Sequence, residues 1–358
     1  MKLSERNYKR IVVKIGSSLF CSGERGFDHS IFNHIVSQIS DLISLKKEVL
    51  IVSSGAIALG MRVLGLKSRP KELSYLQATA SLGQNVLMDS YSQVFGYNKI
   101  NCGQILLTWE DFNDRKRYLN AKNTILTLLK LGSIPIINEN DTVSTDEIKF
   151  GDNDRLSALV SSLIGADLLI ILSDIDGLLD KDKKIIQVVD EITPQIKAFA
   201  SSTNNKTCVG GMITKIEAAK ISMDSGIPCV IANGRTKDII LSVIKEPEKY
   251  GTLFFPKRGL AARKRWIAFG TKPKGKILVD DGARRALSNK KSLLSVGVTG
   301  LEGNFDIGDI VSVVDKQDYE FARGKVGLSS KQLDKVKGSR YDKEVIHRDN
   351  IVILQELA

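Results

Sequence analysis

The chain has 358 residues, of which 42% are hydrophobic, and it carries a formal net charge of +11. This length exceeds the usual size of one domain, so we expect two. The polar segment Met1–Asn7 and the shortness of every aliphatic run argue against a signal peptide and a membrane span, and we expect a cytoplasmic protein. The four cysteines form no C-x-x-C pair and the three histidines are dispersed, so a zinc site, a disulfide framework and histidine chemistry are not indicated.

The first 250 residues alternate short apolar runs with helix-like stretches. Ile31, Ile35 and Ile39 repeat at helical spacing after Asp28, a residue suited to an N-cap. The expected strands are 11–15, 49–52, 104–107, 134–137, 168–172 and 229–232, and the further expected helices lie near 75–95, 118–131, 155–164 and 212–225. Strands that alternate with helices predict an α/β fold, a sandwich with a mainly parallel open sheet between helical layers.

The pattern changes after about Lys257, so we predict one domain over 1–257, a linker over 258–274 and a second domain over 275–358. Short strands expected at 276–280, 295–298, 309–314 and 350–354, separated by Gly-rich turns, indicate that the second domain is small and β-rich. Residues 256–358 hold 21 Lys and Arg against 13 Asp and Glu, whereas residues 1–255 hold 31 against 28. A basic domain attracts phosphate backbones, which is a weak indication of RNA binding.

Two clusters of acids and amides stand in the middle of the chain, Asn-Glu-Asn-Asp at 138–141 and Gly-Asp-Asn-Asp at 151–154. The first follows an expected strand and the second a turn signal, where α/β proteins place their ligands. Short polar groups must be solvated, hydrogen-bonded or paired, so packing gains nothing from such a concentration. The alternative interpretation is two solvated turns.

Three glycine-containing segments are suited to phosphate chemistry: Lys-Ile-Gly-Ser-Ser at 14–18, Ser-Ser-Gly-Ala-Ile at 53–57 and Gly-Gly-Met-Ile-Thr-Lys at 210–215. None matches the P-loop or the dinucleotide fingerprint, and each alone reads as an ordinary strand-to-helix turn. Together with the acid and amide clusters they supply cations, backbone donors and polar groups for phosphoryl transfer. An ionised carboxylate acceptor needs no strong base, which fits the lack of a catalytic histidine or cysteine.

These motifs, with Gly-Gln-Ile-Leu-Leu-Thr at 103–108, resemble in order and spacing the glutamate 5-kinases of the amino acid kinase family. Segments 279–283, 298–305 and 308–309 resemble the PUA domain that many members carry. The resemblance implies an amino-acid-kinase-like αβα sandwich followed by a PUA-like domain. It also implies phosphorylation of the side-chain carboxylate of L-glutamate by ATP with Mg²⁺, the first step of proline biosynthesis.

The resemblance assigns roles by motif. Lys14 and Lys215 would stabilise the transferring phosphoryl group, and either Asp154 or Asp152 would orient both lysines, since a carboxylate between two ammonium groups keeps them charged. The residues implied for L-glutamate are Ser54, Asp141 and Asn153. The residues implied for ATP are Lys14, Gly16, Ser173, Asp174, Gly210, Gly211, Met212, Thr214 and Lys215.

Two positions depart from the family pattern, since members commonly have Thr where this chain has Ser173 and Val209. Ser173 keeps a hydroxyl but Val209 does not, so phosphate contacts there are expected to rest on backbone N–H groups. We expect ATP oxygens and water, not protein ligands, to hold most of the Mg²⁺ shell.

The resemblance further implies a homo-oligomer and feedback inhibition by proline through the glutamate site. Free glutamate is favoured over an N-acylated form by Asp141 and by the appended basic domain. Residues 62–77 are either a mobile element near that site or an ordinary surface loop. The competing hypotheses are an RNA-binding or RNA-modifying protein, and a nucleotide or carbamate kinase on the same fold.

Overall fold

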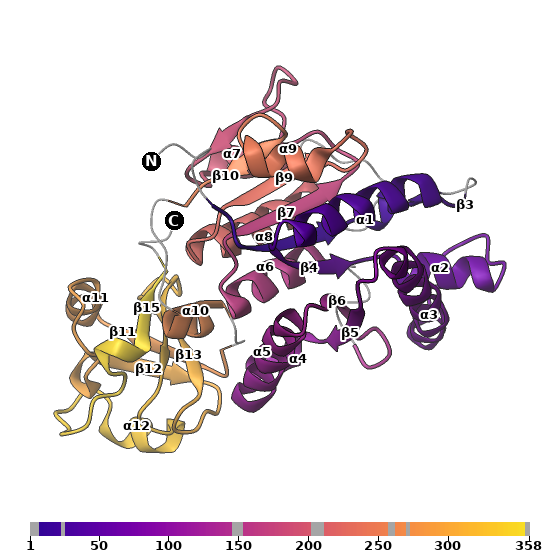
Figure 1. Ribbon diagram of the computed structural model, residues 1–358. Helices are drawn as coiled ribbons and strands as arrows, with labels where there is room; N and C mark the ends of the chain where they lie inside the picture. The colour runs from indigo at the N-terminus through magenta and orange to yellow at the C-terminus, as the bar shows by residue number, and fades with distance from the viewer. Residues whose placement is uncertain are drawn as a thin grey trace. The chain divides into compact units, whose positions relative to one another are not determined.

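Figure 1 shows the computed structural model, which describes residues 7–22, 26–144, 153–201, 211–256, 262–269 and 273–354. The chain divides into two compact units. The first consists of Met1–Asp111 with Arg115–Gly259, and the second of Phe112–Asp114 with Leu260–Ala358. No helix in the described ranges combines the length and the apolar character needed to cross a membrane.

The first unit is built on an eight-stranded sheet in the order β5-β6-β4-β1-β7-β9-β10-β8. Neighbouring strands are parallel except β9 and β10. The strands are β1 (Arg10–Ile15), β4 (Glu48–Ser53), β5 (Cys102–Leu107), β6 (Ile134–Glu139), β7 (Leu168–Ser173), β8 (Val188–Val189), β9 (Cys229–Asn233) and β10 (Thr252–Phe254), and a separate pair is β2 (Cys21–Ser22) with β3 (Gly26–Phe27). The six strands expected from the sequence are confirmed, as is the mainly parallel sheet.

Helices cover both faces of this sheet (Figure 1). They are α1 (His29–Ser44), α2 (Ala56–Val63), α3 (Leu73–Tyr97), α4 (Trp109–Asn113), α5 (Arg115–Lys130), α6 (Asn153–Ile164), α7 (Pro194–Ser201), α8 (Met212–Asp224) and α9 (Ile239–Lys245). The Asp28 carboxylate accepts a hydrogen bond from the Ile31 N–H, so the expected N-cap of α1 is confirmed. Helices α2, α4, α7 and α9, each of eight residues or fewer, were not predicted.

The alternation of side chains along β1 separates the two layers of the first unit. Ile11, Val13 and Ile15 are buried in one apolar core, to which α1, α3 and α9 contribute. Successive side chains of a strand point to opposite faces, so Lys14 enters the layer on the other side, where α6 contacts β1. A lysine at this position is therefore buried by the geometry of the strand.

The second unit has a five-stranded sheet in the order β12-β11-β13-β14-β15. Its elements are α10 (Ala262–Phe269), β11 (Lys276–Val279), α11 (Asp281–Ser288), β12 (Val298–Glu302), β13 (Ile310–Val314), β14 (Glu320–Lys325), α12 (Ser330–Val336) and β15 (Ile351–Ile353). Its core gathers apolar residues from the sheet and from the segments that cover it, among them Ile277, Val313 and Phe321. The expectation of a small, strand-rich unit is confirmed.

The structure of this unit differs from the sequence prediction in two places, and it shows a helix within the expected linker. Residues 295–297 form a 3₁₀ turn, not a strand, because the Gly297 N–H bonds back to the Leu294 carbonyl. Strand β14 was missed, since its sequence Glu-Phe-Ala-Arg-Gly-Lys has no clear apolar alternation. Part of the expected linker is helix α10, which buries Ile267 and Ala268 against strands β13 and β15.

Candidate active site

The parallel register brings the carboxyl ends of four strands together. Lys14 on β1 pairs with Val52 on β4 and with Ile171 on β7, and β4 in turn pairs with β6. The residues that follow these strands therefore share one edge of the sheet, which is where open α/β sheets bind ligands. Most of the residues singled out from the sequence lie along this edge or at the helices that begin there.

Asp154 lies between the two lysines. Its Oδ1 is 2.6 Å from Lys14 Nζ, and its Oδ2 is 3.5 Å from Lys215 Nζ. Thr214 Oγ1 donates to Oδ2 at 3.0 Å. The side chains of Lys14, Asp154 and Lys215 are only 8%, 3% and 7% exposed. Burial alone raises the pKa of Asp154, but the two ammonium groups and the hydrogen bonds from Lys14 and Thr214 lower it below its ordinary value.

Each member of this cluster comes from the end of a different element. Lys14 is the penultimate residue of β1, Asp154 the second residue of α6 and Lys215 the fourth residue of α8. Helices α6 and α8 pack against each other, and the contact of Asp154 with Lys215 shows that their N-terminal turns lie together. Helix N-termini carry partial positive charge, which adds to the attraction for an anion at this place.

Asn153, directly before Asp154, lies in a second, uncharged network. Its Nδ2 donates to the Ser53 carbonyl at 2.8 Å, to Ser54 Oγ at 3.0 Å and to Asn138 Oδ1 at 2.8 Å. Asn153 and Asn138 are both buried. The structure thus brings Ser54 and Asn153 into direct contact.

Asp141 stands on the turn that follows β6, partly buried. Burial raises the pKa of this carboxyl to about 6, although the Arg69 guanidinium opposes the shift. Gln77, near the start of α3, donates from Nε2 to the Ser144 carbonyl at 3.2 Å. The segment 62–77 therefore reaches the turn that carries Asp141.

The residues predicted for ATP lie at the ends of β1 and β7 and at the start of α8. The Gly16 N–H donates to the Leu172 carbonyl at 3.0 Å, and a Cβ at Gly16 would stand 3.1 Å from that oxygen. Ser173 donates from its hydroxyl to Asp174 Oδ1 at 3.1 Å. Gly211 precedes α8, Met212 begins it, and Thr214 is tied to Asp154. Asp152, Val209 and Gly210 lie outside the described residues.

Sequence reasoning missed one contact of this region. Gln84 on α3 accepts from Asn138 Nδ2 at 2.8 Å and is itself buried. A signal was present in the sequence, because Gln77, Gln84 and Tyr91 repeat at seven-residue spacing along a helix that must bury one face. The spacing alone did not say which face is buried.

Comparison with known proteins identifies the family of the chain. The family model described as the amino acid kinase family matches residues 9–233, and the model of the PUA domain matches residues 275–347. A glutamate 5-kinase from Thermoanaerobacter pseudethanolicus is 47% identical over 97% of this chain and 98% of its own length. A glutamate 5-kinase from Geobacter metallireducens is 43% identical over 98% of both.

Two solved structures share the fold at low identity. The N-acetylglutamate synthase from Neisseria gonorrhoeae, complexed with coenzyme A and N-acetyl-glutamate, has a TM-score of 0.52 at 14% identity and covers 70% of this chain and 60% of its own. The carbamate kinase from Giardia lamblia bound to AMP-PNP has a TM-score of 0.50 at 17% identity, over 71% of this chain and 100% of its own. These two show the fold alone, whereas the relatives of similar length show the family. The chain belongs to the amino acid kinase family, among the glutamate 5-kinases, and carries a C-terminal PUA domain.

Proposed function

We propose that the chain transfers the γ-phosphoryl group of ATP to the side-chain carboxylate of L-glutamate, and that Lys14, Asp154 and Lys215 carry the transfer. The supporting observation is the buried contact of one carboxylate with two ammonium groups. These three side chains together carry a net charge of +1, held where water is scarce. Negative charge that spreads over a phosphoryl group in flight is stabilised most strongly in such a place.

The acceptor needs no activation by a base. A glutamate side chain is ionised at neutral pH, so one of its oxygens attacks the γ-phosphorus directly while the bond from that phosphorus to the bridging oxygen of ADP breaks. The products are L-glutamyl 5-phosphate and ADP, and no proton moves. The protein has to align the two reactants and to neutralise charge.

For the substrate we assign Ser54, Asn153 and Asp141. Ser54 directly follows β4, Asn153 is the first residue of α6, and the two side chains contact each other. The Asp141 carboxylate is suited to the substrate ammonium. An N-acylated substrate lacks that ammonium charge, so this assignment favours free glutamate. Proline also carries an ammonium group, and we propose that it inhibits at the same place.

For ATP we assign Lys14, Gly16, Ser173, Asp174, Gly211, Met212, Thr214 and Lys215, and Gly210 by its place in the same motif. Asp152 stays a second candidate for ordering the lysines. The described residues contain no group of three or more His, Cys, Asp or Glu that would hold a metal, and Asp154 is already paired with lysines. We therefore propose that Mg²⁺ arrives with ATP, ligated by phosphate oxygens and water.

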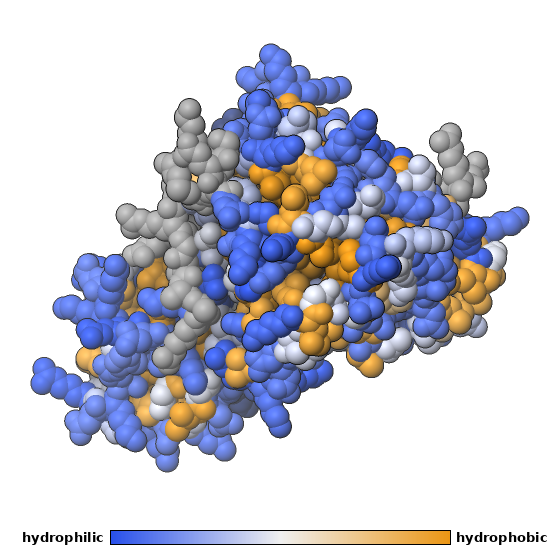
Figure 2. Space-filling view, viewed as in Figure 1, coloured by the Kyte–Doolittle hydropathy of each residue, from blue (hydrophilic) through white to orange (hydrophobic). Residues whose placement is uncertain are grey.

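We further propose that the enzyme is a cytoplasmic homo-oligomer that associates through the first unit. Val63, Leu64, Leu66 and Tyr75, at the end of α2 and the start of α3, are all exposed. Apolar surface is visible over α2 at the right of Figure 2. Exposed apolar residues that gather in this way are typical of a surface that another protein copy covers.

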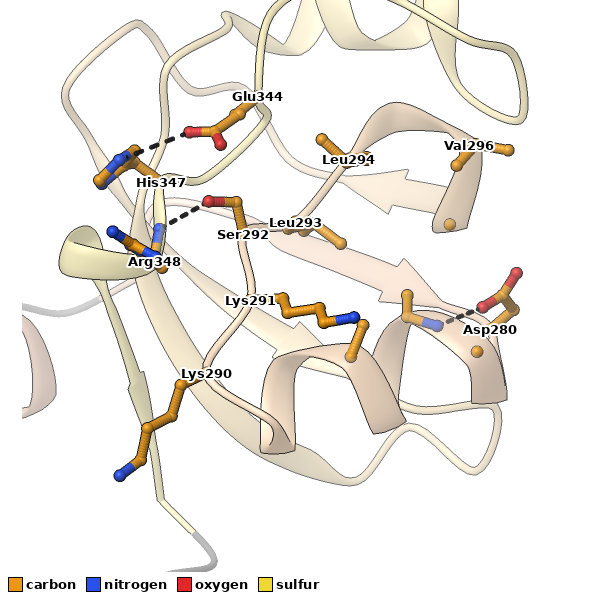
Figure 3. Close-up of a pocket in the computed structure, with 14 residues that line it drawn as sticks. Asp280, Lys290, Lys291, Ser292, Leu293, Leu294, Val296, Glu344, His347 and Arg348 are labelled. Carbon is orange, nitrogen blue, oxygen red and sulfur yellow. Dashed lines mark hydrogen bonds and ion pairs between the residues drawn. The ribbon is translucent and has the colours of Figure 1, made fainter.

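A second candidate activity is RNA binding by the PUA domain. This unit has a pocket of about 730 Å³ between α11, the segment 290–297 and residues 344–348. Lys290, Lys291 and Arg348 contribute to its lining, as do the acidic Asp280 and Glu344, and Figure 3 shows Lys291 next to Leu293 in the middle of the view. Cationic groups next to apolar surface suit a nucleotide strand, because its phosphates are attracted by the cations and its bases contact the apolar surface.

The activity test is ATP-dependent hydroxamate formation in the presence of hydroxylamine. We expect L-glutamate to form a hydroxamate, and N-acetylglutamate and L-aspartate not to. A nucleoside monophosphate would form no hydroxamate in any case, so ADP release is measured for it, and we expect none. Lys14→Met and Lys215→Met should each lower kcat by about 10²- to 10³-fold with a smaller change in the KM of glutamate. Lys9→Met, next to β1 but exposed, is the matched control. Near-normal turnover of both active-site variants would overturn the transfer mechanism.

The organising role of Asp154 predicts a loss of stability in Asp154→Asn, which leaves two ammonium groups buried. The free energy of unfolding at pH 7 should fall by about 3–5 kcal/mol. The pKa of Asp154 is lower in the folded state than in the unfolded state, where it is about 4. The stabilisation by the ionised carboxylate is therefore complete above the unfolded-state pKa, and it is lost as pH falls through the folded-state pKa. Urea denaturation across pH should show the difference from wild type shrinking only below about pH 4. Glu246→Gln, which breaks the exposed pair with Lys249, should change nothing measurable.

The role of Asp141 predicts an acid limb in the pH profile. Its pKa is raised to about 6, so the carboxylate that receives the ammonium is ionised above that pH and protonated below it. The kcat/KM for glutamate should fall about tenfold for each pH unit below the break. Arg69→Gln should move the break to higher pH, because Arg69 opposes the shift. A profile whose break stays in place in Asp141→Asn would assign it to another group.

The RNA hypothesis is tested on the full chain by titrating a fluorescent single-stranded RNA at several salt concentrations. We expect the affinity to fall with salt, and the combined change of Lys290 and Lys291 to Ala to reduce the salt slope by about two. The same change should leave glutamate phosphorylation unaltered. An affinity that does not depend on salt, or a variant that binds as wild type does, would remove the pocket from consideration.

A further inference from the structure

Helix α3 presents three polar side chains to the ligand edge of the sheet. Gln77, Gln84 and Tyr91 are seven residues apart, which is close to two helical turns, so they lie on one face. Gln77 donates to the Ser144 carbonyl, and Gln84 accepts from Asn138. Tyr91 shares a hydrogen bond of 2.9 Å with Ser53 Oγ.

The middle contact, at Gln84, reaches the proposed substrate residue through a relay of three buried amides. Asn138 Nδ2 donates to Gln84 Oε1 at 2.8 Å, and Asn153 Nδ2 donates to Asn138 Oδ1 at the same distance. Gln84, Asn138 and Asn153 are 9%, 2% and 7% exposed. No ionised group takes part, so the relay is held by hydrogen bonds alone.

Two backbone groups fix the direction of the relay. The Glu139 N–H can only donate, and it meets Asn138 Oδ1 at 2.9 Å. The Ser53 carbonyl can only accept, and it meets Asn153 Nδ2. Asn138 must therefore turn its Nδ2 toward Gln84, and Gln84 must present an oxygen. Without that oxygen a buried donor on Asn138 would lack a partner.

Two buried atoms of the relay are left open in the part of the chain that the structure describes, Gln84 Nε2 at one end and Asn153 Oδ1 at the other. Asn153 Oδ1 is buried and has no hydrogen-bond partner among the described residues. A buried acceptor without a donor is unfavourable, and a ligand that brings a donor relieves the cost. An amino acid brings such a donor in its ammonium group.

The position of Gln84 is set by close packing of its helix. Gly83 faces α2 so tightly that a Cβ there would stand 1.8 Å from the Ala56 carbonyl oxygen. Gly60 on α2 leaves no more room, since its Cβ would stand 1.8 Å from the Thr79 carbonyl oxygen on α3. Helix α3 is therefore locked to α2, which begins two residues after Ser54.

We infer that Gln84 is a positioning residue of the glutamate site. Gln84 accepts a hydrogen bond from Asn138 and so holds the Asn138 amide in place. Asn138 in turn holds Asn153, with Asn153 Oδ1 turned to the substrate ammonium. Gln84 itself does not touch the substrate. The inference rests on the proposed phosphorylation of glutamate at this edge.

The test compares two substitutions of similar size. Gln84→Met removes the acceptor, and the KM of glutamate should rise about tenfold, the effect of one hydrogen bond, with kcat and the KM of ATP nearly unchanged. Gln84→Glu keeps an oxygen at the same place and should restore most of the glutamate affinity. Gln93→Met, an exposed position on the same helix, is the matched control and should behave as wild type.

A glutamate KM in Gln84→Met equal to wild type would overturn the inference, as would an equal rise in the KM of ATP or an equal defect in Gln84→Glu. If Gln84→Met does not fold, Gln84→Asn, whose amide is one methylene shorter, takes its place with the same expectations. Thermal shift on adding L-glutamate gives a second readout, and it should shrink in Gln84→Met and persist in Gln93→Met. A wild-type chain that forms no glutamyl hydroxamate would refute the proposed function itself, which this order of experiments keeps separate.

Discussion

The first unit depends on burying three charges in one place. Moving an ion out of water costs several kcal/mol, and only close pairing offsets that cost. Asp154 is within 2.6 Å of Lys14 and 3.5 Å of Lys215, so the end of β1 and the starts of α6 and α8 must meet at one point. Strand order and helix packing in this half of the sheet therefore follow the needs of a charged site, and an anion that enters it completes the balance of charge.

The ligand edge is divided by chemistry. Near β1, β7 and α8 the side chains are cations and hydroxyls, which suits phosphates. Near β4 and β6, amides and hydroxyls form a neutral network, and the Asp141 carboxylate stands on the turn after β6, a set that suits the orientation of a small polar molecule. The first two residues of α6 belong one to each side, since Asn153 joins the amides and Asp154 the lysines. In the proposed transfer, the N-terminus of α6 thus fixes the position of the phosphoryl donor, ATP, relative to the acceptor, glutamate.

Much of this was accessible from the sequence, because it depends on local patterns. Long apolar runs such as 168–172 identified the strands that build the edge, and a lysine or a polar cluster after a strand identified what stands there. Elements with weak local signals were missed, such as β14 and the two-residue β8. The contact of Asp154 with both lysines needed the fold, since it arises from the packing of three elements that are far apart in the sequence. Gln84 was invisible for a related reason, because its role comes from which face α3 buries.

The adjacency of Asn153 and Asp154 limits how this site is able to change during evolution. Both side chains are fixed by one turn of backbone, so a shift that reshapes the amide network also moves the carboxylate that holds the lysines. Ser54 and Asp141 stand on separate segments, after β4 and after β6, and neither is bonded to a lysine in the described contacts. In the proposed transfer, a change of acceptor therefore meets fewer constraints at Asp141 than at the start of α6, where Asn153 also contacts Ser54 and Asp154 holds both lysines.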